Sequence, residues 1–288
     1  MPPQTTALSF DDALRRLDAA PLIPGPPLVD TIRGLGANNA AYFRNSVEGG
    51  LELQQVPEEL DRLADDLLTR FRDRPVRYLE IGVGGCATLI FLSRLWARHG
   101  ITASLTAVDN LDYQRRGLVA AQQMRIDWCI GHLGLEFADL DTRTPDFQRW
   151  LTGRQFDVIL VDGDHSFAGC LWDTVSCAGV LAPGGVLVLH DVTSQACPGV
   201  GEVFAVAQSV ASAAHVFSAA DTCGIGVLEG LADNPELIRA ALSASLHRVD
   251  RLEHRAAELT ELTASVRAVI TRALPRALEE RRARRASA

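Results

Sequence analysis

The sequence predicts a doubly wound α/β fold with a mostly parallel, seven-stranded sheet. Short runs rich in Val, Ile and Leu alternate with helix-length segments along the middle of the chain. This alternation is the pattern of βαβ units whose strands are buried on both faces. A glycine-rich turn also joins the first run to an apolar helix. Right-handed crossovers then place helices on both faces of the sheet.

Five runs are expected to form the main strands, and two further segments are expected to close the sheet as a hairpin-like pair, HVFSA and GIGVLEG. The five runs cover residues 76–83, 104–110, 136–140, 156–163 and 185–192. A helix is predicted from Val56, because Pro57 suits a first helical turn, two acids follow it and leucines recur at helical spacing. The segment PGVGEVFAVAQ is expected to form another helix after the fifth strand.

Three segments are expected along the chain. Residues 1–50 are rich in Pro and Gly and predict a cap or lid, although the first twenty are equally consistent with an unstructured tail. Residues 51–230 form the main domain. In residues 231–288 apolar positions recur every three or four residues up to Pro275, which predicts a long amphipathic helix. This C-terminal helix either packs on the domain or forms a homo-oligomer.

The composition is that of an ordinary globular enzyme, with 47% hydrophobic and 22% charged residues among 288. The net charge of −8 argues against a nucleic-acid partner, which would require concentrated positive charge. The sequence shows no secretory signal, no apolar stretch near the roughly 18 residues that span a membrane, and no CxxC pair. We therefore expect a cytoplasmic protein with no membrane partner.

A glycine turn follows the first strand and contains Gly82, Gly84 and Gly85. This spacing also fits a dinucleotide fingerprint, so the turn alone does not identify a cofactor. Glu80 separates the alternatives, because a carboxylate there opposes a pyrophosphate on the helix N-terminus. S-adenosylmethionine has no phosphate and carries ammonium and sulfonium charges that a carboxylate favours. The turn and Glu80 together predict that cofactor.

Two further acids follow the next strands. Asp109 ends the second strand, where an acid can accept hydrogen bonds from both ribose hydroxyls of the cofactor. Asp139 follows the third strand, where it can face the adenine edge. Each can instead be a turn residue at the end of its strand, and for Asp139 the two interpretations are equally weighted.

The joint order of LEIGVGG, AVDN, VILVDGDHSFAGCLWD, LAPGGVLVLHDV and GIGVL resembles class I S-adenosylmethionine-dependent methyltransferases. The resemblance runs from about Leu51 to Leu228. It is closest to the branch with macrolide-sugar O-methyltransferases and cephalosporin-hydroxylase-like proteins. It implies methyl transfer to a hydroxyl of a small molecule, such as a natural-product intermediate, with N- or C-methylation left open. The expected cofactor-binding residues are Glu80, Gly82, Gly84, Gly85, Asp109, Asp139 and Asp162.

Acids and histidines follow the fourth and fifth strands and are expected to converge at the carboxyl ends of the sheet. Such oxygen and imidazole ligands suit Mg²⁺ or Mn²⁺. The resemblance implies Asp162, His190 and Asp191 as metal ligands and His165 as the general base. His190 departs from the relatives, which usually place a carboxylate there, and this change favours a softer metal or none. Alternatively, Asp162 and Asp164 are caps and His190 is a core histidine.

Some residues near this cluster are expected to have other roles. The segment SQACPGV after the fifth strand is a candidate wall of the acceptor pocket. The remaining histidines are expected to be structural or surface residues: His99, His132, His215, His247 and His254.

Two other function classes compete with an O-methyltransferase. A nicotinamide-dependent oxidoreductase is disfavoured by Glu80, and the sequence has no lysine for a Tyr-x-x-x-Lys pair. A non-catalytic member of the fold that binds the cofactor or a partner stays open, because fold resemblance alone does not establish catalysis.

Overall fold

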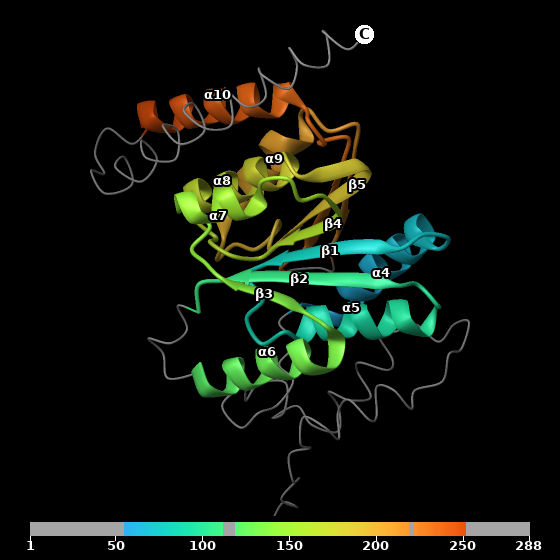
Figure 1. Ribbon diagram of the computed structural model, residues 1–288. Helices are drawn as coiled ribbons and strands as arrows, with labels where there is room; N and C mark the ends of the chain where they lie inside the picture. Colours follow the sequence, from blue (N-terminus) through green and yellow to red (C-terminus); the bar gives the residue numbers. More distant parts are fainter. Residues whose placement is uncertain (1–54, 112–118, 219–221, 252–288) are drawn as a thin grey trace, which may run out of the picture. The chain divides into compact units, whose positions relative to one another are not determined.

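The computed structural model describes residues 55–111, 119–218 and 222–251 (Figure 1). Their strands form a seven-stranded sheet in the order β3-β2-β1-β4-β5-β7-β6. Strands β2 and β3 follow on one side of β1, and β4 and the later strands follow on its other side. This reversal of the strand order confirms the predicted doubly wound α/β fold. The chain divides into two compact units. We call residues up to 139 together with 217–225 the first unit, and residues 140–216 together with those from 226 the second unit.

The first unit contains three strands in parallel register. They are β1 (Val76–Ile81), β2 (Ala103–Asp109) and β3 (Glu136–Asp139). Its helices are α4 (Pro57–Phe71), α5 (Ala87–Arg98) and α6 (Val119–Leu133). Figure 1 shows α5 and α6 lying against one face of these strands. The register pairs Asp109 with Asp139, so both acids end their strands at the same edge.

Helix α4 confirms the helix predicted from Val56. Val56 is the extended N-cap residue and Pro57 lies in the first turn, where its missing N–H leaves no helical hydrogen bond unmade. Leu60, Leu63 and Leu67 are fully buried on one face, as their spacing requires. The buried Glu59 of the same helix accepts a hydrogen bond of 3.0 Å from the backbone N–H of Gly224.

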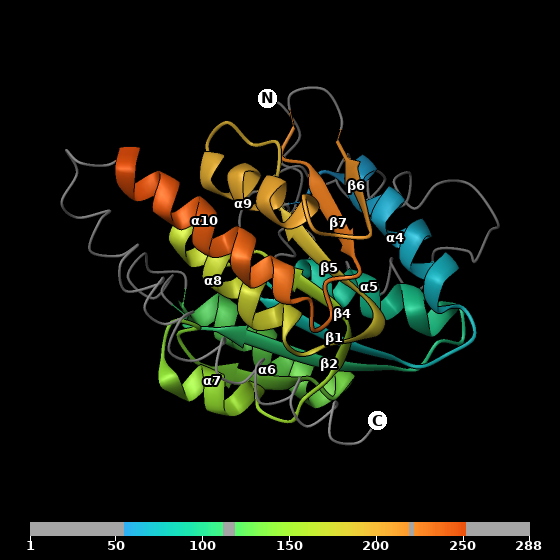
Figure 2. The same ribbon diagram turned by 90° about the horizontal axis from the view of Figure 1, so that it is seen from above.

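The second unit is layered within itself. It contains β4 (Phe156–Val161), β5 (Leu181–His190), β6 (Ala213–Phe217) and β7 (Ile225–Glu229). Its helices are α7 (Pro145–Leu151), α8 (Phe167–Ala178), α9 (Pro198–Gln208) and α10 (Pro235–Arg251). Helices α8 and α9 pack on β5, and α10 lies across both of these helices (Figure 2).

Strand β5 begins four residues before the predicted start at Gly185. Its register against β4 shifts between Phe156 and Val158, so the strand continues through an irregularity at Leu181–Gly184. A Cβ at Gly185 would lie 2.8 Å from the carbonyl oxygen of Asp157, so only glycine fits this close approach. Sequence patterning missed the extension because glycines ordinarily end a strand.

The predicted closing pair is confirmed by β6 and β7, which are neighbours in the sheet. The N–H of Ser212, just before β6, donates to the carbonyl of Glu229 at the end of β7. The beginning of one strand therefore meets the end of the other, and the two strands run antiparallel.

The predicted cap of residues 1–50 and the chain beyond Arg251 lie outside the described residues, as does His254. The three-segment organisation stays a prediction. Helix α10 begins at Pro235, within the segment predicted to be helical, and Arg248 of this helix forms a 2.5 Å ion pair with Glu202 of α9. Among the described helices, none is long and apolar enough to span a membrane.

Candidate functional site

The glycine turn of the first unit joins β1 to α5 and is held in left-handed backbone conformations. Gly82 has φ +81° and Gly84 has φ +47°, and Cys86 also has a positive φ of +60°. A Cβ built on Gly84 meets no atom within 4 Å, so the space beside this residue is open. Glycine is therefore required at position 84 for its backbone conformation rather than for lack of space.

Glu80 lies in β1, two residues before Gly82, and is 3% exposed. Its carboxylate accepts a 2.6 Å hydrogen bond from the hydroxyl of Tyr78, which lies on the same face of the strand. The ring of Tyr78 packs edge-on against Trp96 of α5, with 5.3 Å between centroids. Our sequence analysis did not identify Tyr78, although its i, i+2 spacing from Glu80 was a usable signal.

Asp109 connects the end of β2 to the glycine turn. One carboxylate oxygen accepts from the backbone N–H of Gly84 at 3.0 Å, and the other accepts from that of Leu111 at 2.7 Å. Burial raises the pKa of Asp109, and the backbone N–H groups oppose that shift. Asp109 thus fixes the shape of the turn, and the exposed Asp139 lies beside it on β3.

In the second unit, two imidazoles and two carboxylates gather after β4 and β5. His165 Nε2 lies 3.2 Å from Asp162 Oδ1 and 3.0 Å from Asp191 Oδ2. His190 Nδ1 lies 3.1 Å from the same oxygen of Asp162 and 3.6 Å from that of Asp191. The four predicted residues are therefore close together, and each imidazole contacts both carboxylates.

The backbone explains how these side chains meet. Asp162 directly follows β4, and His190 is the last residue of β5. Asp191 adopts a left-handed conformation with φ +65°, which breaks the alternation of a strand after His190. Ser166 caps α8 through its hydroxyl, and Asp164 accepts from the Ser166 N–H. Asp164 was predicted to cap the helix. In the structure its carboxylate instead contacts the turn that precedes α8, and Ser166 is the N-cap residue.

The charges of this cluster favour imidazolium–carboxylate pairs. Hydrogen bonds that His165 donates to the carboxylates of Asp162 and Asp191 raise the pKa of this imidazole to about 10. Burial works against ionisation of Asp162, but the His190 charge and both imidazole hydrogen bonds hold its pKa below the usual range. For His190, burial is outweighed by Asp162 and its pKa is also raised.

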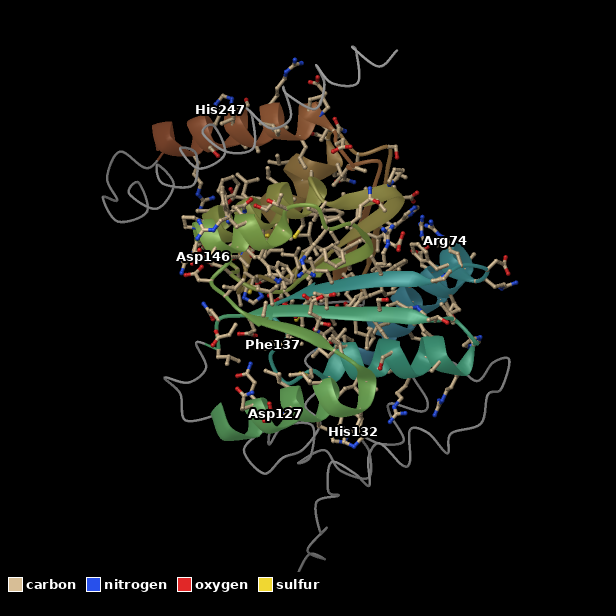
Figure 3. The ribbon with its side chains drawn as sticks, viewed as in Figure 1. Arg74, Asp127, His132, Phe137, Asp146 and His247 are labelled. Atoms are coloured by element: carbon tan, nitrogen blue, oxygen red, sulfur yellow. The ribbon has the colours of Figure 1, made fainter. Side chains whose placement is uncertain are left out.

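The histidines that were expected to be structural or surface residues are more exposed to solvent than His190 of this cluster. His99, His132, His215 and His247 are exposed. His132 stacks on Trp128 of its own helix, and Figure 3 shows His132 and His247 projecting from α6 and α10. Only 4% of His190 is exposed, and its Nε2 has no hydrogen-bond partner among the described residues.

Cys197 is a cluster member that our sequence analysis named only as part of a pocket wall. One ligand atom from each of His165, Asp191 and Cys197 lies within 4.8 Å of the other two. All six cysteines are free thiols, and Cys197 and Cys223 are the two that are half-buried. The cysteines are not spaced in the sequence like metal ligands. The proximity of Cys197 to His165 therefore became visible only in the structure, where α9 packs onto the turn that carries His165.

The donor atoms near His165 have spacings that suit a cation. Ligands at adjacent positions around an octahedral metal at about 2.1 Å lie about 3 Å apart. The spacings from His190 Nδ1 to the two carboxylate oxygens, 3.1 Å and 3.6 Å, are close to this value. The Nε2 of His190 lies on the other side of the ring from Nδ1 and has no hydrogen-bond partner among the described residues, so it cannot bind a cation held at Nδ1. Among the described residues, the ligand atoms of His165, Asp191 and Cys197 are close enough together to hold a metal ion, and no such group includes Asp162, so Asp162 as a metal ligand stays a prediction.

Residues 79–192 match the family model described as a methyltransferase domain. No curated protein matches the chain. The solved structures that are similar to it include three with TM-scores below 0.5.

The O-methyltransferase from Bacillus cereus is 18% identical, with a TM-score of 0.44, and the match covers 73% of this chain and 93% of that one. The calicheamicin methyltransferase CalS11 is 14% identical, with a TM-score of 0.47, covering 76% and 91%. MycE from the mycinamycin pathway, in complex with Mg and S-adenosylhomocysteine, is 18% identical with a TM-score of 0.41. That match covers 59% of this chain and 48% of MycE, so the chain spans about half of its length.

Proposed function

We propose that the chain is a class I S-adenosylmethionine-dependent methyltransferase, since residues 79–192 match a methyltransferase-domain family model, and that it methylates a hydroxyl of a small molecule. The acceptor we expect is an intermediate of natural-product biosynthesis. The observation that carries the proposal is the glycine turn with Glu80 before it and Asp109 bound to it. This arrangement offers acceptors for an ammonium group and for ribose hydroxyls, and its two carboxylates would repel a phosphate.

The proposed cofactor site of the first unit uses Glu80, Gly82, Gly84, Gly85, Asp109 and Asp139. Asp162, in the second unit, stays a residue that the sequence alone predicts to bind the cofactor. The open space beside Gly84 leaves room for a ligand next to the turn. Asp109 already accepts two backbone N–H groups, so its geometry is fixed before the cofactor binds. Such preorganisation lowers the entropic cost of binding.

The proposed catalytic base is His165, whose side chain is 39% exposed while those of Asp162 and Asp191 are about one-tenth exposed. An exposed imidazole backed by two carboxylates can receive the proton of an acceptor hydroxyl. While Asp162 and Asp191 accept hydrogen bonds from His165, the raised pKa keeps this imidazole protonated. The base therefore requires another positive charge on those carboxylates.

A divalent cation is the proposed source of that charge, with Asp162, His190 and Asp191 as the residues that would hold it. Mg²⁺ or Mn²⁺ in such a site would lower the pKa of an acceptor hydroxyl and orient it. Positioning of acceptor and cofactor would contribute most of the rate enhancement. The chain is proposed to act in the cytoplasm, with α10 and the segment after it as a candidate surface for self-association.

Calorimetry with S-adenosylhomocysteine and with NAD(H) tests the cofactor. Binding of S-adenosylhomocysteine without a response to NAD(H) is expected, and binding of NAD(H) alone would contradict the proposal. A screen of hydroxylated metabolites, read as a mass gain of one methyl group, then tests turnover. Chelator should abolish that turnover and Mg²⁺ should restore it. Cofactor binding with no methylated product across the screen would favour a non-catalytic member of the fold.

A further inference from the structure

The first turn of α9 brings Cys197 toward His165. Cys197 is the N-cap residue of this helix, and Gly199 lies in its first turn. A Cβ at Gly199 would fall 2.4 Å from the backbone nitrogen of Phe167 and 2.9 Å from the carbonyl oxygen of His165. The backbone of α9 therefore packs directly on the turn that carries His165. This close approach, which requires glycine, holds the thiol beside the imidazole.

Three donors of different chemistry meet at this contact. His165 offers an imidazole nitrogen, Asp191 a carboxylate oxygen and Cys197 a sulfur, all within 4.8 Å of one another. Around a tetrahedral metal at about 2.1 Å, neighbouring donor atoms lie about 3.4 Å apart. Small side-chain rotations would therefore bring these donors into a coordination sphere, and solvent reaches the half-buried His165 and Cys197.

The chemistry of the donors determines which cation fits. Mg²⁺ prefers oxygen ligands in an octahedral arrangement and binds thiolates weakly. Zn²⁺ binds imidazole, carboxylate and thiolate together in a tetrahedron, and a site with three protein ligands leaves one position open. His190, whose Nδ1 lies 3.6 Å from the Asp191 oxygen, is available as a further nitrogen ligand.

We propose that His165, Asp191 and Cys197 form a thiolate-containing site for a Zn²⁺-class cation, and that filling it inhibits methyl transfer. This proposal rests on the proposed function in one respect only, the role of His165 as base. A metal on the imidazole nitrogen occupies the lone pair that would accept the proton of the acceptor hydroxyl. Zn²⁺ and Mg²⁺ then have opposite effects: Mg²⁺ supports turnover on the oxygen ligands, and Zn²⁺ withdraws the base.

Cobalt substitution tests the site without cofactor or acceptor. Co²⁺ added to the chelator-treated full-length protein should give a sulfur-to-cobalt charge-transfer band in the near ultraviolet. Cys197→Ser should remove this band and lower Zn²⁺ affinity tenfold or more, measured by competition with a chromophoric chelator. Cys223→Ser tests the competing thiol ligand, because Cys223 is the other half-buried thiol and also belongs to a group that could hold a metal ion. If Cys197 is the ligand, Cys223→Ser should keep the band.

A band that is absent from the wild-type protein, that persists in Cys197→Ser, or that disappears only in Cys223→Ser would overturn the proposal. Cys197→Ala provides a second variant without the thiol. Circular dichroism of both variants shows whether each keeps the wild-type fold. Where an acceptor is found, Zn²⁺ should inhibit the wild-type enzyme at least tenfold more strongly than Cys197→Ser. If the cobalt band behaves as expected and S-adenosylhomocysteine fails to bind, the metal site stands and the proposed function fails.

Discussion

In the first unit, Glu80 and Asp109 accept hydrogen bonds from a phenol and from backbone N–H groups, whereas in the second unit Asp162 and Asp191 accept them from imidazoles. Glu80 accepts from the phenol of Tyr78, and Asp109 accepts from two backbone N–H groups. Asp162 and Asp191 instead share His165 and His190. Backbone N–H groups neither change their charge with pH nor bind metals, so the contacts of Asp109 are fixed. Imidazole partners can do both, so the arrangement in the second unit can change its partners during a reaction.

The largest effect expected from this comparison is that of His165→Ala. Removing a general base lowers turnover by about 10²- to 10⁴-fold, while binding of S-adenosylhomocysteine to the first unit should stay within about twofold of wild type. Methyl transfer followed by mass spectrometry and calorimetry of the same preparation measure both. His247→Ala removes an exposed histidine of α10 and serves as the control. Equal loss of binding and turnover in His165→Ala would contradict the division of roles.

Asp173→Asn tests the other unusual carboxylate of the second unit. Asp173 is 1% exposed. Burial raises its pKa from 3.8 to about 7; the hydrogen bond with Thr142 and the charge of Arg143 oppose the shift, and the charges of Asp164 and Asp141 add to it. Between these two values the unfolded chain has lost a proton that the folded protein keeps. The free energy of unfolding therefore falls as pH rises from about 4 to about 7, by up to about 4 kcal/mol.

Asp173→Asn should flatten this pH dependence and make the protein more stable than wild type at pH 8. Urea unfolding at a series of pH values measures the effect, in the absence of metal. Asp127→Asn, at an exposed position of α6 (Figure 3), should leave the profile unchanged. Parallel profiles for wild type and Asp173→Asn would show that the carboxyl is solvated or paired in solution.

Asp109→Ala should weaken S-adenosylhomocysteine binding by about 100-fold. The change removes the acceptor for the Gly84 and Leu111 N–H groups as well as the proposed ribose contact, and hydrogen bonds to charged groups contribute about 1.5–3 kcal/mol. Calorimetry measures the affinity. Asp139→Ala is the matched variant at the paired position of β3, and its exposed side chain predicts a smaller loss. A larger loss in Asp139→Ala would reverse the proposed ranking of the two acids.

Tyr78→Phe should have the smallest effect. It removes the hydroxyl that donates to the buried Glu80 and preserves the ring that packs against Trp96. We expect a loss of about 1 kcal/mol in the free energy of unfolding and less than a tenfold loss of S-adenosylhomocysteine affinity. Urea unfolding and calorimetry measure these changes. A loss of cofactor affinity as large as that in Asp109→Ala would place Tyr78 among the residues that contact the cofactor.

Local patterning was sufficient for the strands and for the glycine turn. Alternation of apolar runs with helix-length segments predicted β1 to β5, and the start of α4 followed from Pro57 and the leucines after it. The extension of β5 to Leu181 was missed, because the close approach of Gly185 to Asp157 depends on the neighbouring strand. The hydrogen bond from Tyr78 to Glu80 joins residues only two positions apart, but it was also missed because it belongs to no recognised sequence motif.

By itself, the sequence determined which segments form strands and where the glycine turn lies, because both are properties of consecutive residues. It also determined that the acids and histidines lie at the carboxyl ends of the strands, because parallel strands share one polarity. Only the tertiary structure decided which partners those groups take. Asp109 binds the backbone of Gly84, His165 lies between Asp162 and Asp191, and Cys197 reaches His165. These contacts join distant segments whose approach is set by packing, as at Gly199, and no local pattern encodes that geometry.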